Sequence, residues 1–261
     1  MSIPSQASYA LQIAPRESAV GPHSSGEDRA ACLASYMTHE LRAPLTAIYA
    51  ALSMMEIQLA GGGDDGMRRM MTLALRNAER LNGLVTDILD FEKLSVGRMR
   101  MDFAPTAPEK LLAESADSLR ASALAKGVSL HCGPREESLP RVLADGRRCV
   151  QVLTNLLSNA IKFTPPGGRV ELSARAGGPG HPQAVLFEVA DTGPGIPAED
   201  LERVFGCFEQ SALGEKTSSG TGLGLTLARL MVEGQGGRIW AEGRRRRGAA
   251  FLFTLPVALL A

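Results

Sequence analysis

The chain has 261 residues, of which 44% are hydrophobic and 21% are charged, as is usual for a globular protein with a sizeable core. Its 28 Lys and Arg residues balance its 28 Asp and Glu residues, so no overall positive charge would attract nucleic acid or an anionic membrane. The basic run at 244–247 is interpreted as a solvated hairpin turn. The 4 cysteines show no C-x-x-C spacing, and no apolar run reaches the roughly 20 residues that span a bilayer. We therefore expect a cytoplasmic protein with reduced thiols, no membrane span and no nucleic acid partner.

Two helices are predicted in the first part of the chain. Residues 1–27 are rich in Ser, Pro, Gly and Ala without periodicity, so a disordered tail or linker is expected there. Apolar residues then recur at three- and four-residue steps over 27–59 and over 67–96, on either side of a Gly-rich break. This predicts an antiparallel helical hairpin at 28–97. One face of its second helix is expected to carry Leu81, Leu84, Val85, Ile88 and either Phe91 or Glu92.

The hairpin is expected to dimerise. A lone hairpin cannot cover apolar stripes on both of its helices, whereas two hairpins can do so in a four-helix bundle. The sequence therefore predicts a homodimer through residues 28–96. The alternative is that these helices pack on the rest of the same chain.

After Gly97 the pattern becomes mixed α and β. Strands are predicted at 98–105, 128–133, 169–176, 184–191, 237–243 and 249–256. Helices are predicted at 107–127, at 145–164 with Asp145 as the N-cap, and at 223–233. The fold class is therefore a helical hairpin, dimeric as a four-helix bundle, followed by an α/β sandwich over 98–258 in which helices cover one face of a mixed sheet.

Two glycine-rich segments in the second part suggest a nucleotide. Asp191 ends a predicted strand and is followed by Gly193 and Gly195, which would let the backbone approach a flat base while the carboxylate accepts a hydrogen bond from an exocyclic amine. A second glycine run lies just before a helix, where unpaired N–H groups and the helix dipole favour phosphate. Its members are Gly220, Gly222 and Gly224. Either segment alone could be no more than a flexible loop.

A polar stripe on the predicted helix at 145–164 adds cation chemistry. Asn155, Asn159 and Lys162 are spaced i, i+4 and i+7, so they share one helix face. An amide oxygen is a hard ligand that suits Mg²⁺, and a lysine supplies a point charge for phosphate. The alternative is a polar stripe in water, which the low helix propensity of Asn makes the poorer explanation.

Five segments together resemble a known family. The segments HELRAPL, NLLSNAIKFT, DTGPGI, FGCFEQ and GTGLGL occur in the order and rough spacing of the boxes of bacterial sensor histidine kinases, and the resemblance covers residues 30–257. It implies a two-component catalytic core of the histidine kinase/Hsp90-like type that uses ATP and Mg²⁺. It also implies transfer of a phosphoryl group to an aspartate on the receiver domain of a response regulator. For the input signal two alternatives are open: it arrives through an upstream sensor partner, or this chain is a cytoplasmic fragment.

The resemblance assigns the phosphate acceptor. His39 would be the phospho-acceptor, and Pro44 would form the family's kink just below it. A neutral imidazole is needed to attack the γ-phosphate, and Glu40 could accept a hydrogen bond from the other ring nitrogen, which would fix the tautomer. His23, His131 and His181 have no such neighbours and receive no role.

The resemblance also assigns the nucleotide site. Asp191 would bind the adenine amine, Asn159 would ligate Mg²⁺, and Asn155 and Lys162 would support the metal and the phosphates. Gly193 and Gly195 would shape the base pocket. The lid over the triphosphate would bend at Gly220, Gly222 and Gly224 and be anchored by Phe205 and Phe208.

Two other functions fit part of this pattern. A dimeric scaffold could bind nucleotide without transferring phosphate, although the intact His39–Glu40 pair argues against it. Another ATPase or a serine kinase could share the nucleotide fold but would lack the HELRAPL hairpin. One departure from the family is Ala43, where many relatives have Thr or Asn; this predicts a kinase with little phosphatase activity toward its regulator.

Overall fold

The computed structural model describes residues 41, 44–55, 64–133, 138–178, 180–207, 222–244 and 248–259. Residues Pro44–Ala261 form one compact unit, to which the following description refers. Several predictions lie outside the described residues: the tail at 1–27 and the roles of His39, Glu40, Ala43, Phe208 and Gly220.

The predicted second helix of the hairpin is confirmed. Residues 44–55 are helical, and helix α2 spans Asp64–Ser95. Leu84, Ile88 and Phe91 are at most 6% exposed, whereas Val85 is 43% exposed. Val85 lies at the edge of this face, about 100° around the helix axis from Leu84, and the described part of the same chain does not cover it. Among the described elements, α2 packs against helix α6 (Gly224–Glu233), so part of α2 packs on the rest of the same chain, as the alternative to the dimer predicted.

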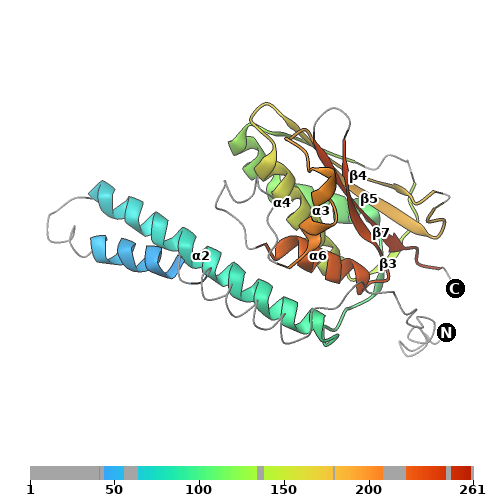
Figure 1. Cartoon of the computed structure of the whole chain (residues 1–261), viewed down its shortest axis with the longest axis horizontal. Coiled ribbons are helices and arrows are strands. Elements are labelled where there is room, and N and C mark those ends of the chain that lie inside the picture. Colours follow the sequence, from blue (N-terminus) through green and yellow to red (C-terminus); the bar gives the residue numbers. More distant parts are fainter. Residues whose placement is uncertain are drawn as a thin grey trace, which may run out of the picture. The chain divides into compact units, whose positions relative to one another are not determined.

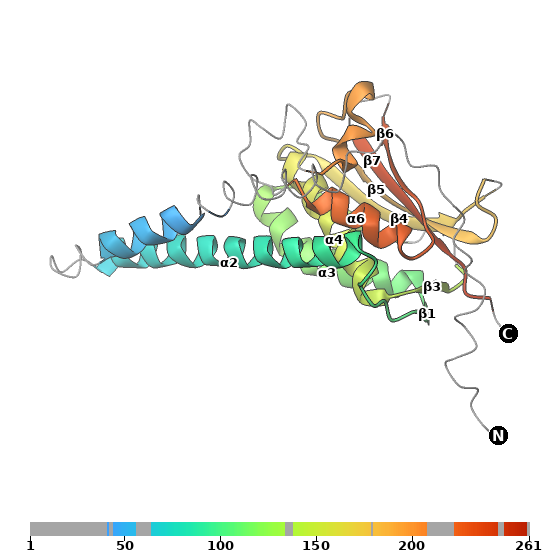
Figure 2. The same cartoon turned by 60° about the horizontal axis from the view of Figure 1, so that its bottom comes forward.

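An α/β sandwich follows the helices, as predicted (Figures 1 and 2). Helices α3 (Pro108–Lys126), α4 (Gly146–Phe163) and α6 cover one face of a sheet in which the strand order is β2-β4-β5-β7-β6. Its strands are β2 (Ser129–Cys132), β4 (Arg169–Ala176), β5 (Ala184–Asp191), β6 (Ile239–Gly243) and β7 (Ala249–Pro256). Among the described strands of this sheet, only β2 pairs in parallel, with β4. Two short 3₁₀ helices, Ala198–Asp200 and Arg203–Phe205, follow β5.

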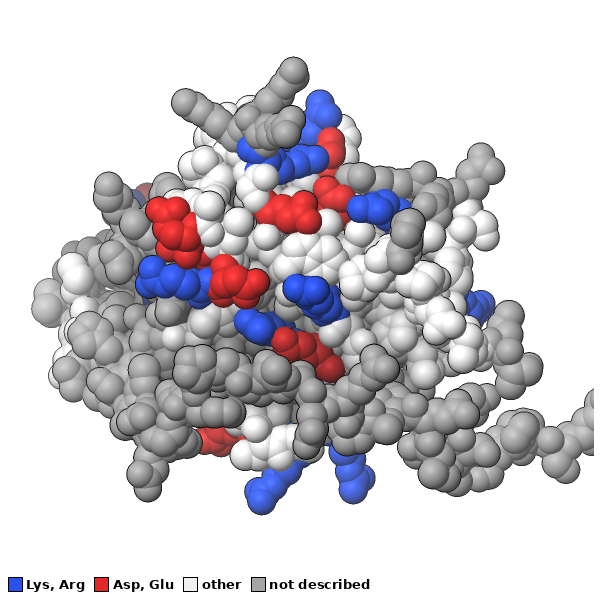
Figure 3. Space-filling view, turned by 45° about the vertical axis from the view of Figure 1, so that its right-hand side comes forward, with Lys and Arg blue, Asp and Glu red and all other residues white. Residues whose placement is uncertain are grey.

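The core lies between the sheet and the three helices. Phe187 on β5 pairs in register with Phe253 on β7, and their rings stack with centroids 4.8 Å apart. On the opposite face of the sheet, a smaller cluster of Leu186, Ala190, Ala250 and Leu252 packs against Trp240. Acidic and basic side chains are interspersed on the surface that Figure 3 views, in keeping with the zero net charge.

The predicted strand at 98–105 is mostly wrong. Only β1 (Ala104–Thr106) forms there, and it pairs with β3 (Val142–Ala144), a strand that the sequence did not predict. The alternating residues before β1 use their N–H groups elsewhere. Arg98 and Met99 donate to the carbonyl of Lys93 at the end of α2, at 2.8 and 3.1 Å. A ladder cannot form where these donors already close the helix.

The segment between α2 and β1 is anchored at two points. The N–H of Asp102 donates to Oδ2 of Asp145 at 3.0 Å, and the methyl group of Met101 packs over Gly234 at the end of α6. Asp145 is 3% exposed, so this contact is buried. Among the described residues, no helix is long and apolar enough to cross a bilayer.

Candidate functional site

Helix α4 places the predicted polar stripe at the site. Asp145 caps the helix as predicted: its Oδ1 accepts hydrogen bonds from the N–H groups of Arg147 and Arg148, at 3.0 and 3.2 Å. The opposite side of α4 is buried in the core through Val152, Leu153, Leu156, Leu157 and Ile161. This burial fixes the rotation of the helix, so the polar stripe is directed away from the core. Its members are half-buried: Asn155, Asn159 and Lys162.

Asn155 connects α4 to the start of α6. Its side-chain nitrogen donates to the carbonyl of Gly224 at 3.2 Å. This bond fixes the orientation of the amide and leaves the side-chain oxygen as a potential ligand for a cation. The structure therefore brings two predicted site residues from different segments into direct contact.

Asp191 lies at the end of β5 and is 5% exposed. Its Oδ1 accepts hydrogen bonds from the backbone N–H groups of Gly193 at 2.7 Å and Ala249 at 3.3 Å. Burial raises the pKa of Asp191, although these two N–H groups and the charge of Arg244 lower it. Both bonds fall on Oδ1, so Oδ2 is the oxygen that can accept from a ligand amine. A buried carboxylate with one committed oxygen suits recognition of an adenine.

Glycines surround Asp191 because the backbone leaves no room for side chains. A Cβ atom on Gly193 would lie 2.9 Å from Oδ1 of Asp191, and one on Gly195, which has a φ of +87°, would lie 3.1 Å from the carbonyl oxygen of Gly248. Gly248 itself has a φ of +107°, and its Cβ would collide with the carbonyl oxygen of Asp191. The sequence did not predict Gly248 as a site residue. Its only signal was a glycine directly after the arginine run and before a strand.

The start of α6 carries the described part of the predicted lid. Gly222 has a φ of +65°, which L-residues rarely adopt, and Gly224 begins the helix. Thr226 donates to the carbonyl of Gly206 at 2.9 Å. Phe205 is 3% exposed and packs edge-on against Phe251, with ring centroids 6.1 Å apart. Phe205 is therefore a packing residue, and its role as an anchor of the lid stays a prediction.

Positive charge gathers at the end of α4. Lys126, the last residue of α3, donates through its ammonium group to the carbonyl oxygens of Ile161, at 2.8 Å, and of Lys162. Burial lowers the pKa of Lys162, and the charges of Arg80 and Lys126 lower it further. The sequence did not single out Lys126 or Arg80, because both lie far from Lys162 in the chain. Phosphate oxygens would be stabilised by this cluster.

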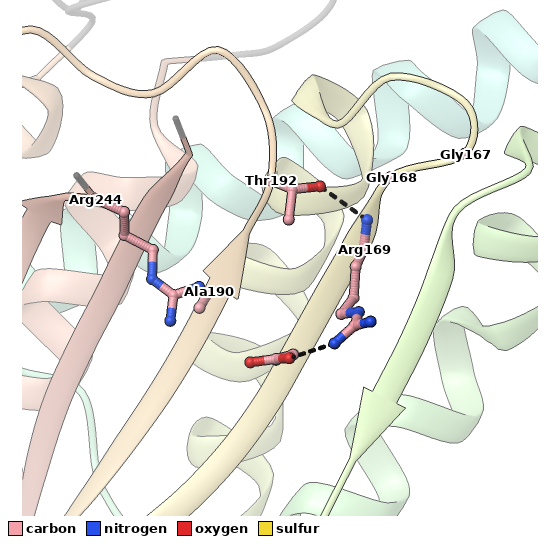
Figure 4. Close-up of a pocket in the computed structure, with 7 residues that line it drawn as sticks. Gly167, Gly168, Arg169, Ala190, Thr192 and Arg244 are labelled. Carbon is pink, nitrogen blue, oxygen red and sulfur yellow. Dashed lines mark hydrogen bonds and ion pairs between the residues drawn. The ribbon is translucent and has the colours of Figure 1, made fainter. Parts of the chain in front are cut away.

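A separate shallow cavity of about 320 Å³ lies on the sheet face that the helices do not cover (Figure 4). Ala190 forms part of its lining, and its charged residues are matched: Arg169 pairs with Glu171 at 3.2 Å, and Arg244 pairs with Glu188 at 3.9 Å. No predicted site residue lines this cavity. Among the described residues, no group of three or more His, Cys, Asp and Glu side chains could hold a metal ion.

Two protein families match successive parts of the chain. Residues 32–97 match the His Kinase A (phospho-acceptor) domain, and residues 144–259 match the histidine kinase-, DNA gyrase B- and HSP90-like ATPase family. His39 falls in the first range, and the α4 stripe, Asp191 and the start of α6 fall in the second.

Individual relatives agree with these matches. The chain is 35% identical to the histidine protein kinase DivJ of Caulobacter vibrioides over 223 residues, which are 85% of this chain and 36% of DivJ. Full-length ShkA in complex with AMPPNP is 30% identical, with a TM-score of 0.65, over 87% of this chain and 46% of ShkA. Histidine kinase ThkA in complex with the response regulator TrrA is 25% identical, with a TM-score of 0.68, over 89% of this chain and 64% of that chain.

The chain spans only part of the length of its curated relatives. For DivJ and two others the aligned part is between 26% and 55% of the relative's length. Within that part, the helical region and the α/β sandwich occur in the order that the family shows. The resemblance found in the sequence is thereby confirmed, and the chain belongs to the sensor histidine kinases.

Proposed function

We propose that the chain is an ATP-dependent protein histidine kinase that phosphorylates its own His39 and passes the phosphoryl group to an aspartate of a response regulator. The observation that carries the proposal is the buried Asp191, whose Oδ2 is left for a ligand amine inside a glycine cradle. The same chain carries His39 in its match to the phospho-acceptor domain. Binding of AMPPNP by ShkA and of a response regulator by ThkA supports the two ligand classes.

Each residue of the site would have a separate task. Asp191 would accept a hydrogen bond from the adenine amine, while Gly193, Gly195 and Gly248 keep side chains out of the base pocket. Asn159 would ligate Mg²⁺ through its amide oxygen, and the metal would neutralise charge on the phosphates. The lid glycines, of which Gly222 and Gly224 are described, would let backbone close over the phosphate chain.

The phospho-acceptor needs a neutral imidazole. One ring nitrogen of His39 would form the N–P bond as the bond between the γ-phosphorus and the bridging oxygen breaks, with ADP leaving. Glu40 would accept a hydrogen bond from the other ring nitrogen and stabilise the positive charge that develops on the ring. The carboxylate of a receiver-domain aspartate would then take the phosphoryl group, which restores the imidazole.

Labelling with γ-phosphate-labelled ATP tests this function. We expect label that is stable in base and lost in acid, as phosphohistidine is, and no label on His39→Gln, which should still bind ATP. Acid-stable label would favour a serine kinase. Nucleotide binding without any label would favour the scaffold. The cognate regulator would be identified by transfer of the label to purified receiver domains.

The homodimer is part of this proposal. Met71, Leu75, Val85 and Leu89 on α2 are between 43% and 58% exposed, and they follow one heptad pattern. Large apolar residues on the other helix of the hairpin are also exposed: Leu45, Tyr49 and Leu52. A second hairpin would cover both rows, and an exposed apolar seam of this length marks an interaction surface.

Sedimentation velocity tests the dimer. Leu89→Glu should place a charge in the seam and yield monomers. Leu124→Glu is the matched control, because Leu124 is 81% exposed on α3, outside the hairpin, and should leave the dimer intact. A dimer that persists in Leu89→Glu would contradict the seam.

A further inference from the structure

The last turn of α4 has two carbonyl groups that its own backbone cannot satisfy. In a continuing helix, the carbonyl groups of Ile161 and Lys162 would accept hydrogen bonds from the N–H groups four residues further along the chain. Those residues are Pro165 and Pro166, which have no N–H group. The sequence after α4 therefore leaves two carbonyl oxygens that need a donor from another segment.

Lys126, the last residue of α3, supplies that donor. Its ammonium group donates to the carbonyl oxygen of Ile161 at 2.8 Å and also to the carbonyl oxygen of Lys162. The carbonyl groups at the end of a helix carry partial negative charge, so a cation is favourable there. Lys126 thus caps α4 from a neighbouring helix.

The backbone on both sides holds Lys126 at this point. Helix α3 ends at Gly127, whose φ is +70° and whose carbonyl oxygen accepts from the N–H of Gly167, in the turn after α4, at 2.7 Å. The first turns of the two helices also lie together, because a Cβ atom on Gly146 would lie 3.9 Å from Cδ2 of Leu111. Helices α3 and α4 are therefore parallel, and their negative ends lie on the same side of the sandwich.

The same end of α4 borders the candidate nucleotide site. A Cβ atom on Gly193 would lie 3.0 Å from the carbonyl oxygen of Phe163, the last residue of α4, and the N–H of Gly193 donates to Asp191 at 2.7 Å. Asn159 and Lys162, which would hold Mg²⁺ and phosphate, lie within about 6 Å of that end along the helix axis. A helix C-terminus is an unfavourable neighbour for phosphate, because both are negative. The proposed site would therefore need a cation at the end of α4.

We infer that Lys126 is a positioning residue for the nucleotide site, whose ammonium group neutralises the negative end of α4 so that this end can lie beside a phosphate chain. This role rests on the proposed function and adds a residue of α3 to the phosphate-binding part of the site. Lys126 acts through the carbonyl groups that it binds and through its charge. Its contribution should therefore grow with the number of phosphate groups on the ligand, because each group adds negative charge.

Calorimetric titration of the full chain with adenosine, ADP and a non-hydrolysable ATP analogue, in the presence of Mg²⁺, tests the inference. Lys126→Gln removes the charge but keeps an N–H donor for the carbonyl groups. It should weaken binding of the analogue about fivefold, weaken ADP binding less, and leave adenosine binding unchanged. Lys126→Arg keeps the charge and should bind all three ligands nearly as the native chain does. The matched control is Lys110→Gln, which removes the same charge from a side chain on α3 that is 70% exposed, and it should change none of the affinities.

The pattern across the three ligands separates an effect of charge from a loss of structure. Urea unfolding establishes that each variant is folded. Unchanged binding of the analogue by Lys126→Gln would overturn the inference, and so would equal losses for adenosine and the analogue. Equally weak binding of the analogue by Lys126→Arg would also overturn it, since the charge would then not be the cause. Failure of the native chain to bind the analogue would instead count against the proposed function.

Discussion

Gln235 accepts a hydrogen bond at its Oε1 from the backbone N–H of Asp145, 2.8 Å away, although 90 positions separate the two residues in the chain. The same oxygen accepts from the thiol of Cys149 at 3.4 Å, and the amide nitrogen donates to the carbonyl of Met231 at 3.0 Å. Gln235 is 1% exposed. It therefore joins the N-cap of α4 to the end of α6, the two helices that carry the contacting residues Asn155 and Gly224.

We expect Gln235→Ala to lower the free energy of unfolding by about 2 kcal/mol, because it leaves a buried N–H without a partner. Urea unfolding measures this. Gln183→Ala is the control, since Gln183 is exposed and should change stability by less than about 0.5 kcal/mol. Equal stability of the two variants would show that the Gln235 bonds are replaced by water.

The stability of the protein should depend on the ionisation of Asp191. Burial raises the pKa of this carboxyl group in the folded state above its ordinary value of 3.8. The folded state therefore binds the proton more tightly than the unfolded state does. The native chain should lose stability relative to Asp191→Asn as the pH rises from 3.8 to the raised folded value, and the difference should then stay constant. Unfolding curves of both proteins from pH 3.5 upward measure it.

The same variant should bind nucleotide poorly. Asp191→Asn keeps an oxygen for Gly193 and Ala249 but replaces the second acceptor with a donor, so the adenine amine would face an N–H group. We expect at least about a tenfold loss of affinity for adenosine. Asp117→Asn, a change at an exposed pair on α3, should bind adenosine as the native chain does. Unchanged adenosine binding by Asp191→Asn would remove Asp191 from the site.

Gly248→Ala should be more harmful than Gly97→Ala. Both glycines have positive φ, at +107° and +65°, so backbone strain should lower the free energy of unfolding of each alanine variant by about 1–2 kcal/mol. At Gly248 the new Cβ would also collide with the carbonyl oxygen of Asp191, whereas nothing lies within 4 Å at Gly97. Thermal unfolding should show a larger loss of stability for Gly248→Ala than for Gly97→Ala. Adenosine titration should show a loss of binding for Gly248→Ala alone. Similar behaviour of both variants would mean that the close approach at Asp191 relaxes at little cost.

The absence of a polar side chain at residue 43 predicts weak phosphatase activity. A methyl group can neither donate nor accept a hydrogen bond to the water that would attack the regulator's aspartyl phosphate. Ala43→Thr should therefore speed decay of a purified phosphorylated regulator, in the presence of ADP and Mg²⁺, while autophosphorylation persists. Rapid decay with the native chain would show that the water is positioned without residue 43.

Much of the sandwich is predictable from local patterns. β4, β5 and β7 occur at the predicted residues because long apolar strands bounded by Gly, Pro and Asp leave few alternatives. The Asp145 cap is also predictable, because the side chain bonds N–H groups only two and three residues further along. The segment before β1 has a strand-like pattern but closes the end of α2, and three-residue β3 is too short for its pattern to be distinctive.

The residues of the candidate site also fall into those that a local pattern predicts and those that it does not. The α4 stripe and the glycines of the DTGPGI segment can be found because the chemistry lies within one helix or one turn. Gly248 and Lys126 depend on segments that meet only after folding, since the Cβ of Gly248 would meet Asp191 and Lys126 reaches the last carbonyl groups of α4.

The anchored segment at Met101 and Asp102 decides how far the sandwich can be trimmed from its amino-terminal side. A fragment that begins at Ala104 would leave Oδ2 of Asp145 without its N–H donor and would uncover Gly234, so α4 would lose support at its first turn and α6 at its last. A fragment that begins at Arg98 keeps both contacts. The smallest stable nucleotide-binding piece therefore includes residues that form neither helix nor strand.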